Sequence, residues 1–339
     1  MMMMIIIILP TMNAFSSNIN TRSGSNRLLE IFEEAKSHQN TRNAIIVPGV
    51  HDALSAKIFA QQGAKALFIS GFGVSASKLG QPDLGLLTQT EMEQTLKNVV
   101  RAVAPYSTPI IVDGDTGYGG TMNIRRTIRD FAAAGAAAIS IEDQIFPKKC
   151  TYAAGPGVRV VSFEECKERI KIALAARDEA RDIDGNDILI LARTDCRAAL
   201  GLEEAVNRCK TFEQLGADIS YAENLQSKDE YIHLAENLKP STLKMLAQVQ
   251  LFPHPIKNEG DDKQMLFTAQ EVGEMNYDLA LFGVTPLQSV VNALESTASE
   301  MLGNGGSSGF VQKSHSTSFQ NLKNVAGFTE ADEFESSVK

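Results

Sequence analysis

Acidic side chains stand at the ends of neighbouring short apolar runs. Asp113 and Asp115 follow one run, and Glu142 follows the next. Residues two apart at a strand end point to the same side, so the two aspartates should face one space. Carboxylates gathered at low dielectric repel one another, and a hard divalent cation removes that repulsion. Oxygen ligands suit Mg²⁺, with Mn²⁺ as the alternative, and the three residues therefore predict a magnesium site.

Two other runs also end in ionisable residues. One ends in Arg193-Thr194-Asp195 and the next in Tyr221-Ala222-Glu223. An aspartate after a strand is also a favoured cap of the following helix. For Asp195, capping and a role in the site are about equally favoured by the sequence.

The stretch 144–160 is long for a connection and contains Lys148, Lys149 and Cys150. Long loops beside a site often close over it. Two lysines next to a cysteine favour its thiolate, so Cys150 is a candidate acid–base thiol. A single cysteine in a polar loop is more often inert.

Two glycine-containing turns lie beside these groups. Residues 116–120 read Thr-Gly-Tyr-Gly-Gly, which fits a tight turn close to the metal site and matches no nucleotide-binding fingerprint. Residues 70–73 read Ser-Gly-Phe-Gly, whose backbone N–H groups could hold a substrate carboxylate. An ordinary turn is the competing interpretation of the second segment.

Eight apolar runs predict the strands that must position these residues, and helical patterns lie between them. This alternation is typical of a (β/α)8 barrel, whose active site lies at the carboxyl ends of the strands. Glycines at 63, 135 and 216 follow helical stretches and are typical of helix ends. The predicted strands are 44–47, 66–70, 109–112, 137–141, 188–192, 218–221, 244–249 and 278–282. The predicted helices are 26–37, 52–62, 91–104, 123–134, 163–181, 202–215, 227–237 and 286–301.

Composition narrows the class of protein. The chain has 339 residues and a net charge of −9, which disfavours nucleic acid as a partner. Its four cysteines lack the spacing of a zinc site or a disulfide scaffold, which favours a reducing compartment. We expect a leader or disordered extension over 1–25, a catalytic barrel over 26–302 and a flexible tail over 303–339. The leader is read equally well as a targeting peptide, which would place the protein in a mitochondrion or plastid rather than the cytoplasm.

These motifs together resemble the isocitrate lyase/phosphoenolpyruvate mutase superfamily. The likeness runs from about residue 45 to 299, and its motifs follow in order at successive strand ends. They are Ser70-Gly71, GQPDLG with Asp83, VDGDTGYGG, SIEDQ, PKKC, LARTD, GLEEAVNR and GADISYAEN.

The resemblance implies a barrel whose eighth helix is exchanged with a neighbouring subunit, in a homodimer or homotetramer. It implies that Asp115 ligates Mg²⁺ directly, with Asp113 and Glu142 acting largely through water. Arg193 would bind substrate oxygens, and Lys148 and Cys150 would lie in the gating loop. Substrate binding would also involve Ser70, Gly71, Phe72, Asp83 and Glu223.

Two departures from the resembled lyases leave the substrate open. Those lyases carry Lys-Lys/Arg-Cys-Gly-His in the loop, whereas Cys150 is followed here by Thr151-Tyr152. Their seventh strand ends in an Asn-Met-Thr-Glu-like segment, whereas this chain reads Gln248-Val249-Gln250. The phosphonate mutases carry Asn-Ser in place of the cysteine.

The expected function is a Mg²⁺-dependent lyase that cleaves a C–C bond in a small 2-hydroxy or 2-oxo di- or tricarboxylate. One alternative is P–C chemistry or hydrolysis, as in a phosphonopyruvate mutase or an oxaloacetate hydrolase, where Thr151 would supply a hydroxyl. Another is a barrel that has lost its reaction. Neither a nucleic acid nor a membrane is an expected partner.

Overall fold

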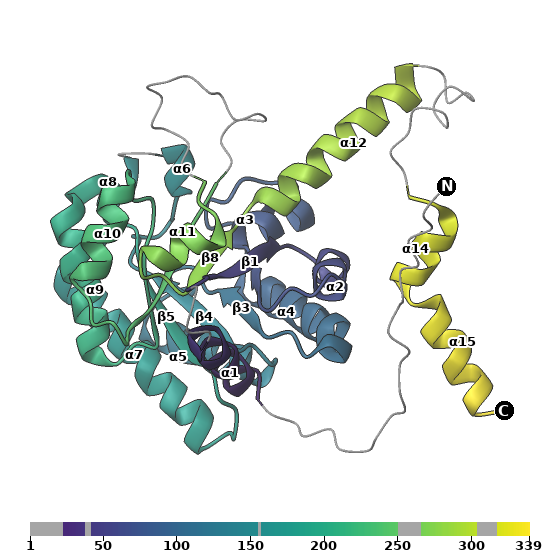
Figure 1. Ribbon diagram of the computed structural model, residues 1–339. Coiled ribbons are helices and arrows are strands. Elements are labelled where there is room, and N and C mark those ends of the chain that lie inside the picture. The colour runs from purple at the N-terminus through teal and green to yellow at the C-terminus, as the bar shows by residue number, and fades with distance from the viewer. Residues whose placement is uncertain (1–22, 38–41, 155–156, 250–265, 304–316) are drawn as a thin grey trace.

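Eight parallel strands close into a barrel in sequence order, with β1 paired to β8 (Figure 1). This computed structural model describes residues 23–37, 42–154, 157–249, 266–303 and 317–339. The predicted (β/α)8 barrel is confirmed, and every predicted strand is present with its ends shifted by a few residues. The strands are β1 Ile45–Val50, β2 Leu67–Ile69, β3 Ile110–Asp113, β4 Ala138–Glu142, β5 Leu189–Thr194, β6 Ile219–Ala222, β7 Leu243–Ala247 and β8 Leu279–Phe282.

Helices surround the strands and bury their apolar faces against them. Capping fixes several starts: Thr88 caps α4, and its backbone N–H donates to Glu91 at 2.9 Å. The surrounding helices are α2 Ala53–Gln61, α4 Gln89–Val103, α5 Thr121–Ala133, α7 Phe163–Asp182, α9 Leu202–Leu215, α10 Lys228–Glu236 and α11 Ala269–Glu274. Short helical turns follow three strands: α3 Gly71–Val74 with a π-turn at Ser75–Leu79 after β2, α6 Thr151–Ala154 after β4 and α8 Arg197–Leu200 after β5.

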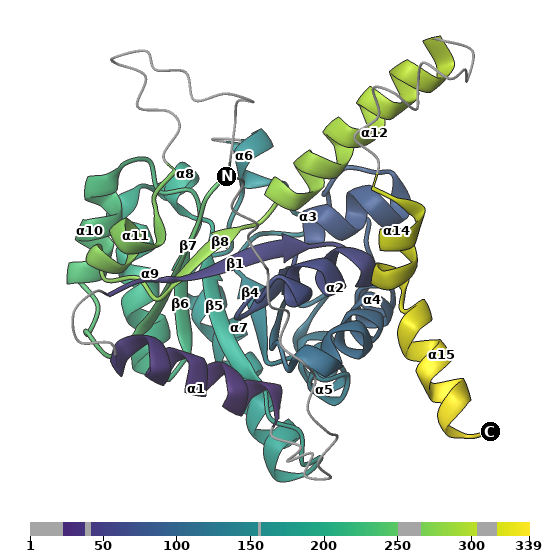
Figure 2. The same ribbon diagram turned by 45° about the vertical axis from the view of Figure 1, so that its right-hand side comes forward.

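Helix α1, Gly24–Ser37, closes the barrel at the amino ends of the strands (Figure 2). Leu28, Ile31 and Phe32 are buried and pack with the inward side chains of the strands. Side chains of α1 therefore fill the barrel interior at the amino ends of the strands, and the polar residues gather at the opposite, carboxyl ends.

Helix α12, Thr285–Gly303, projects away from the barrel instead of lying against it (Figures 1 and 2). Its apolar side chains are left uncovered, with Leu294 62% and Leu302 84% exposed. An eighth helix exchanged between subunits remains a prediction, and this geometry is compatible with it.

The C-terminal part forms two helices, α14 Phe319–Ala326 and α15 Phe328–Ser337. They lie near α2, and Lys57 on α2 faces Glu330 at 3.8 Å. Most of the predicted leader, 1–22, and part of the predicted tail, 304–316, lie outside the described residues. No helix within the described ranges is long and apolar enough to span a bilayer.

Candidate active site

A cavity of about 80 Å³ opens at the carboxyl ends of the strands. It is small, and residues of the loop after β4 line one side of it. Most of the predicted site residues line it: Ser70, Phe72, Asp83, Asp113, Glu142, Lys148, Cys150, Arg193 and Glu223. Gly71 and Asp115 contact Asp113 or Lys148 directly and so belong to the same site.

The turn after β3 sets the two aspartates side by side. The Asp113 carboxylate accepts the Asp115 backbone N–H at 3.2 Å, and both residues are buried. Gly114 between them leaves room that a side chain would not, because an added Cβ would lie 2.6 Å from the Ser140 carbonyl oxygen. Asp115 itself adopts a left-handed φ of 48°, a conformation whose cost the surrounding structure must offset.

Lys148 reaches from the loop to this turn. Its Nζ contacts the Asp115 carboxylate directly and lies 2.9 Å from Oδ1 of Asp83. Burial acts to lower the pKa of Lys148, but the charges of Asp115 and Asp83 outweigh it and raise that pKa well above its usual range. Burial also raises the pKa of Asp115 to about 7, against the opposing charge of Lys148.

Glu142 lies deeper, and its side-chain carboxylate lacks hydrogen bonds among the described residues. It is 1% exposed, and neither carboxylate oxygen has a hydrogen-bond partner among the described residues. Its nearest cationic contact is Nε of Arg193, at 3.5 Å. Burial, followed by the charge of Asp195, raises the pKa of Glu142 well above its usual range.

The donor set fits a hard divalent cation. Buried carboxylate oxygens without partners are costly unless a cation or donor reaches them, and those of Glu142 meet that description. No three Asp, Glu, His or Cys side chains in the described ranges are arranged to hold one ion directly. An ion here would therefore reach some of Asp113, Asp115 and Glu142 through bound water, as Mg²⁺ commonly does.

Arg193, at the end of β5, is held by three acids. Asp195 accepts its Nε at 2.6 Å and its Nη2 at 3.0 Å, and Glu223 lies 3.2 Å from Nη2. The guanidinium also lies over the Tyr221 ring, 5.5 Å from its centre. Burial opposes the charge of Arg193, yet the surrounding carboxylates raise its pKa well above the usual range.

Glu223 receives hydrogen bonds from two phenols. Tyr221 on β6 donates to it, and Tyr152 on α6 is its second phenolic partner. Because Tyr152 belongs to the loop, this bond attaches the loop to β6. Glu223 is thus occupied by protein groups in addition to lining the cavity.

The turn after β2 is less open to a substrate than the sequence predicts. The Ser70 side chain accepts the Gly73 N–H at 3.2 Å, which caps α3. The Gly71 N–H donates to Asp113 at 3.3 Å. Ser70 and Phe72 still line the cavity, so their predicted role in substrate binding remains a prediction.

Cys150 differs from the other cysteines in its surroundings. It is half-buried and lines the cavity, whereas Cys166, Cys196 and Cys209 are buried elsewhere. Of the two lysines expected beside it, Lys148 directs its ammonium to Asp83 and Asp115.

Comparison with known proteins places the chain. The family model for phosphoenolpyruvate phosphomutase matches residues 35–302. The chain belongs to this family, within the isocitrate lyase/phosphoenolpyruvate mutase superfamily of enzymes.

Three relatives represent three activities in the superfamily. The 2,3-dimethylmalate lyase of Eubacterium barkeri is 39% identical over 204 residues, 60% of this chain and 67% of its own. The chloroplastic carboxyvinyl-carboxyphosphonate phosphorylmutase of Arabidopsis thaliana is 38% identical over 272 residues, 79% of this chain and 74% of its own. A solved oxaloacetate acetylhydrolase in complex with the inhibitor 3,3-difluorooxalacetate superposes with a TM-score of 0.80 at 29% identity, covering 93% of this chain and 97% of that one.

A buried ion pair lies behind the site and holds the segment that follows β4. Arg208 on α9 donates to Asp143 at 2.8 Å and to the Val161 carbonyl at 3.0 Å, and both charged groups are 1% exposed. Asp143 in turn accepts the Asp195 backbone N–H at 2.8 Å. The pairing of Arg208 with Asp143 was not predicted, because a position in the middle of helix α9 does not indicate which residue it contacts.

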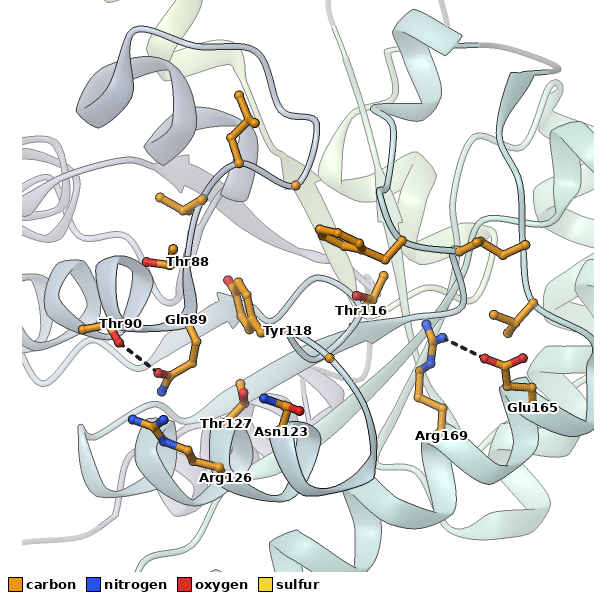
Figure 3. Close-up of a pocket in the computed structure, with 17 residues that line it drawn as sticks. Thr88, Gln89, Thr90, Thr116, Tyr118, Asn123, Arg126, Thr127, Glu165 and Arg169 are labelled. Atoms are coloured by element: carbon orange, nitrogen blue, oxygen red, sulfur yellow. Dashed lines mark hydrogen bonds and ion pairs between the residues drawn. The ribbon is translucent and has the colours of Figure 1, made fainter.

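A second hollow of about 710 Å³ lies outside the barrel, between α4, α5 and α7 (Figure 3). Its basic groups are already engaged: Arg126 contacts Asp130 at 3.1 Å, and Arg169 contacts Glu165 at 3.5 Å. Arg169 also donates to the carbonyls of Glu142 and Gln144, at 2.8 and 2.9 Å. Arg169 therefore supports the end of β4 from behind.

Proposed function

We propose that the chain is a Mg²⁺-dependent lyase that cleaves a C–C bond in a small 2-hydroxy or 2-oxo dicarboxylate. The observation that supports this best is that Cys150, Glu142 and Arg193 line one enclosed cavity beside Asp113. A proton donor, a cation and carboxylates for a metal thus surround a single space. The likeness to the 2,3-dimethylmalate lyase of Eubacterium barkeri agrees with this activity.

The acids, Arg193 and Lys148 would each contribute differently to the reaction. When bound near Asp113, Asp115 and Glu142, the cation would act as a Lewis acid on the carboxylate and the neighbouring oxygen of the substrate. Arg193 places positive charge where negative charge develops on the substrate oxygens. Lys148 draws the loop onto Asp83 and Asp115, which excludes water from the cavity.

Cleavage of a 2-hydroxy acid would move one proton from its hydroxyl oxygen and add another at C3. The 2-hydroxyl gives its proton to a carboxylate of the site and becomes an oxo group as the C2–C3 bond breaks. The electron pair of that bond remains on C3. The Cys150 thiol donates a proton to C3, and the products are a 2-oxo acid and a saturated carboxylate.

The likeness to the 2,3-dimethylmalate lyase of Eubacterium barkeri favours a short dicarboxylate as the substrate. The segment after β7 is described only as far as Val249, so the distal contacts of the substrate remain part of the proposal.

A product screen tests the function. The purified chain is incubated with Mg²⁺ and a panel of 2-hydroxy dicarboxylates, and 2-oxo acid release is followed with and without a chelator. Asp115→Ala should abolish turnover, and Glu274→Gln on the outer helix α11 serves as the matched acid-to-neutral control. Turnover retained by Asp115→Ala would contradict the assigned role.

An oxaloacetate hydrolase is the second candidate. The structural likeness to oxaloacetate acetylhydrolase favours it, and so does Thr151, which is 2% exposed and lines the cavity with its hydroxyl-bearing side chain. Release of oxalate and acetate from oxaloacetate would support this reading. Release of 2-oxo acids from 2-hydroxy acids would support the lyase.

A further inference from the structure

Gln144, two residues beyond the end of β4, uses every polar atom of its amide. It is 2% exposed. Its Nε2 donates to Asp195 Oδ2 at 2.5 Å and to the Lys149 carbonyl at 2.9 Å, and its Oε1 accepts the Lys149 N–H at 2.9 Å. One amide thus joins the end of β5 to the backbone of the loop.

The carboxylate that Gln144 contacts is the one that orients Arg193. Asp195 accepts both Nε and Nη2 of Arg193 and is fixed from behind by its own N–H on Asp143. Asp195 therefore lies between the guanidinium and the loop. Its position cannot change without moving both.

Lys149, whose backbone Gln144 holds, lies between two residues that take part in the proposed reaction. Lys149 is flanked by Lys148, which contacts Asp83 and Asp115, and by Cys150, which lines the cavity. Holding the backbone of Lys149 at both its N–H and its carbonyl fixes where the two neighbouring side chains emerge.

We infer that Gln144 is a positioning residue that couples the orientation of Arg193 to the closed position of the loop carrying Lys148 and Cys150. The inference deepens the proposed function and rests on it for the meaning of those residues. It explains why an amide is needed: two donors face Asp195 and a carbonyl, while one acceptor faces an N–H. A glutamate of the same size would turn both donor contacts into repulsion or leave them unmade.

Alkylation of Cys150 measures loop closure without any need for turnover. The other three cysteines are buried, so iodoacetamide should react mainly at Cys150, and peptide mass spectrometry assigns the site. In Gln144→Glu we expect Cys150 to react about tenfold faster than in the natural chain, because the loop is no longer held closed. Gln144→Met, which is similar in size and uncharged, should accelerate alkylation in the same direction.

Gln248 provides the matched control. It is also 2% exposed, and its amide likewise holds a loop backbone, exchanging hydrogen bonds with the Phe267 N–H and carbonyl. It contacts neither Asp195 nor Lys149. Gln248→Glu should lower the thermal midpoint about as much as Gln144→Glu and leave Cys150 alkylation at its original rate.

The kinetic readout completes the test on a substrate that the product screen identifies. Gln144→Glu should raise KM through Arg193 and lower kcat through Cys150, about tenfold each. Equal acceleration of alkylation in both glutamate variants, or none in either Gln144 variant, would overturn the coupling. If alkylation behaves as expected while no substrate is turned over, the coupling stands and the proposed function fails.

Discussion

Arg208→Met should destabilise the barrel far more than an ordinary surface change. The guanidinium is buried and donates to Asp143, to the Val161 carbonyl and to Glu204, at 2.8, 3.0 and 2.8 Å. Methionine fills a similar volume but donates no hydrogen bond. The substitution therefore leaves the Asp143 carboxylate buried without its cation.

The magnitude follows from what remains. Breaking a buried ion pair from one side costs about 3–5 kcal/mol, and the carbonyl left unpaired at Val161 adds about 1–3 kcal/mol. Two features reduce the sum. Asp143 keeps the Thr194 hydroxyl and the Asp195 N–H as donors, and Glu204 is 26% exposed and can turn to water. We expect a loss of about 4 kcal/mol, a large share of the roughly 5–15 kcal/mol that stabilises a native protein.

Urea unfolding followed by far-ultraviolet circular dichroism measures this loss. Arg181→Met is the matched control, because Arg181 pairs with Asp182 at the surface, where ion pairs contribute about 0–1 kcal/mol. Adding Asp143→Asn to Arg208→Met should recover about 2 kcal/mol, because the buried charge is then gone. If Arg208→Met costs no more than Arg181→Met, the account of the buried pair is refuted.

Further predictions concern the thiol, the metal and the projecting helix. Cys150→Ser should lower kcat about a hundredfold or more while Mg²⁺ binding is retained, as steady-state kinetics and calorimetry would show. Because the pKa of Asp115 is raised to about 7, Mg²⁺ affinity should increase as the pH rises through about 7, with release of a proton. Calorimetry in two buffers of different ionisation enthalpy measures that proton, and no dependence on the buffer would contradict the shift. The stability of the metal-free protein should change in the opposite direction. The pKa of Asp115 in the folded protein lies above its unfolded value near 4, so the free energy of unfolding should fall as the pH rises from about 4 to 7. Leu294→Glu on α12 should weaken subunit assembly in sedimentation velocity if that helix packs on a partner, whereas Glu295→Gln should not.

The periodic part of the fold was predictable from sequence. Eight buried strands leave continuous apolar runs, and glycines at 63, 135 and 216 adopt φ values of 85°, 93° and 90°, which accounts for their place at helix ends. The short helix α11 was not predicted, because six residues give too little periodicity to recognise. The C-terminal helices α14 and α15 were also missed in a stretch whose composition resembles a mobile tail.

The sequence could predict which residues lie at the cavity, but not how they contact one another. Strand ends identify Asp113, Glu142 and Arg193, because a barrel brings those positions to one mouth. The hydrogen-bond or ion-pair partner of each side chain could not be predicted, because it depends on where a loop folds back onto the barrel. The contact of Lys148 with Asp115 and the link from Gln144 to Asp195 are both of this kind.

The position of Lys148 bears on how the proposed metal ion would enter the site. The Lys148 ammonium already contacts both Asp115 and Asp83, so one positive charge offsets part of their negative charge before any divalent ion arrives. We expect the barrel to mature without metal and to survive a chelator intact. Loading of a divalent ion would then exchange one cation for another at Asp115, so the loop would have to open for that exchange and close again before the reaction.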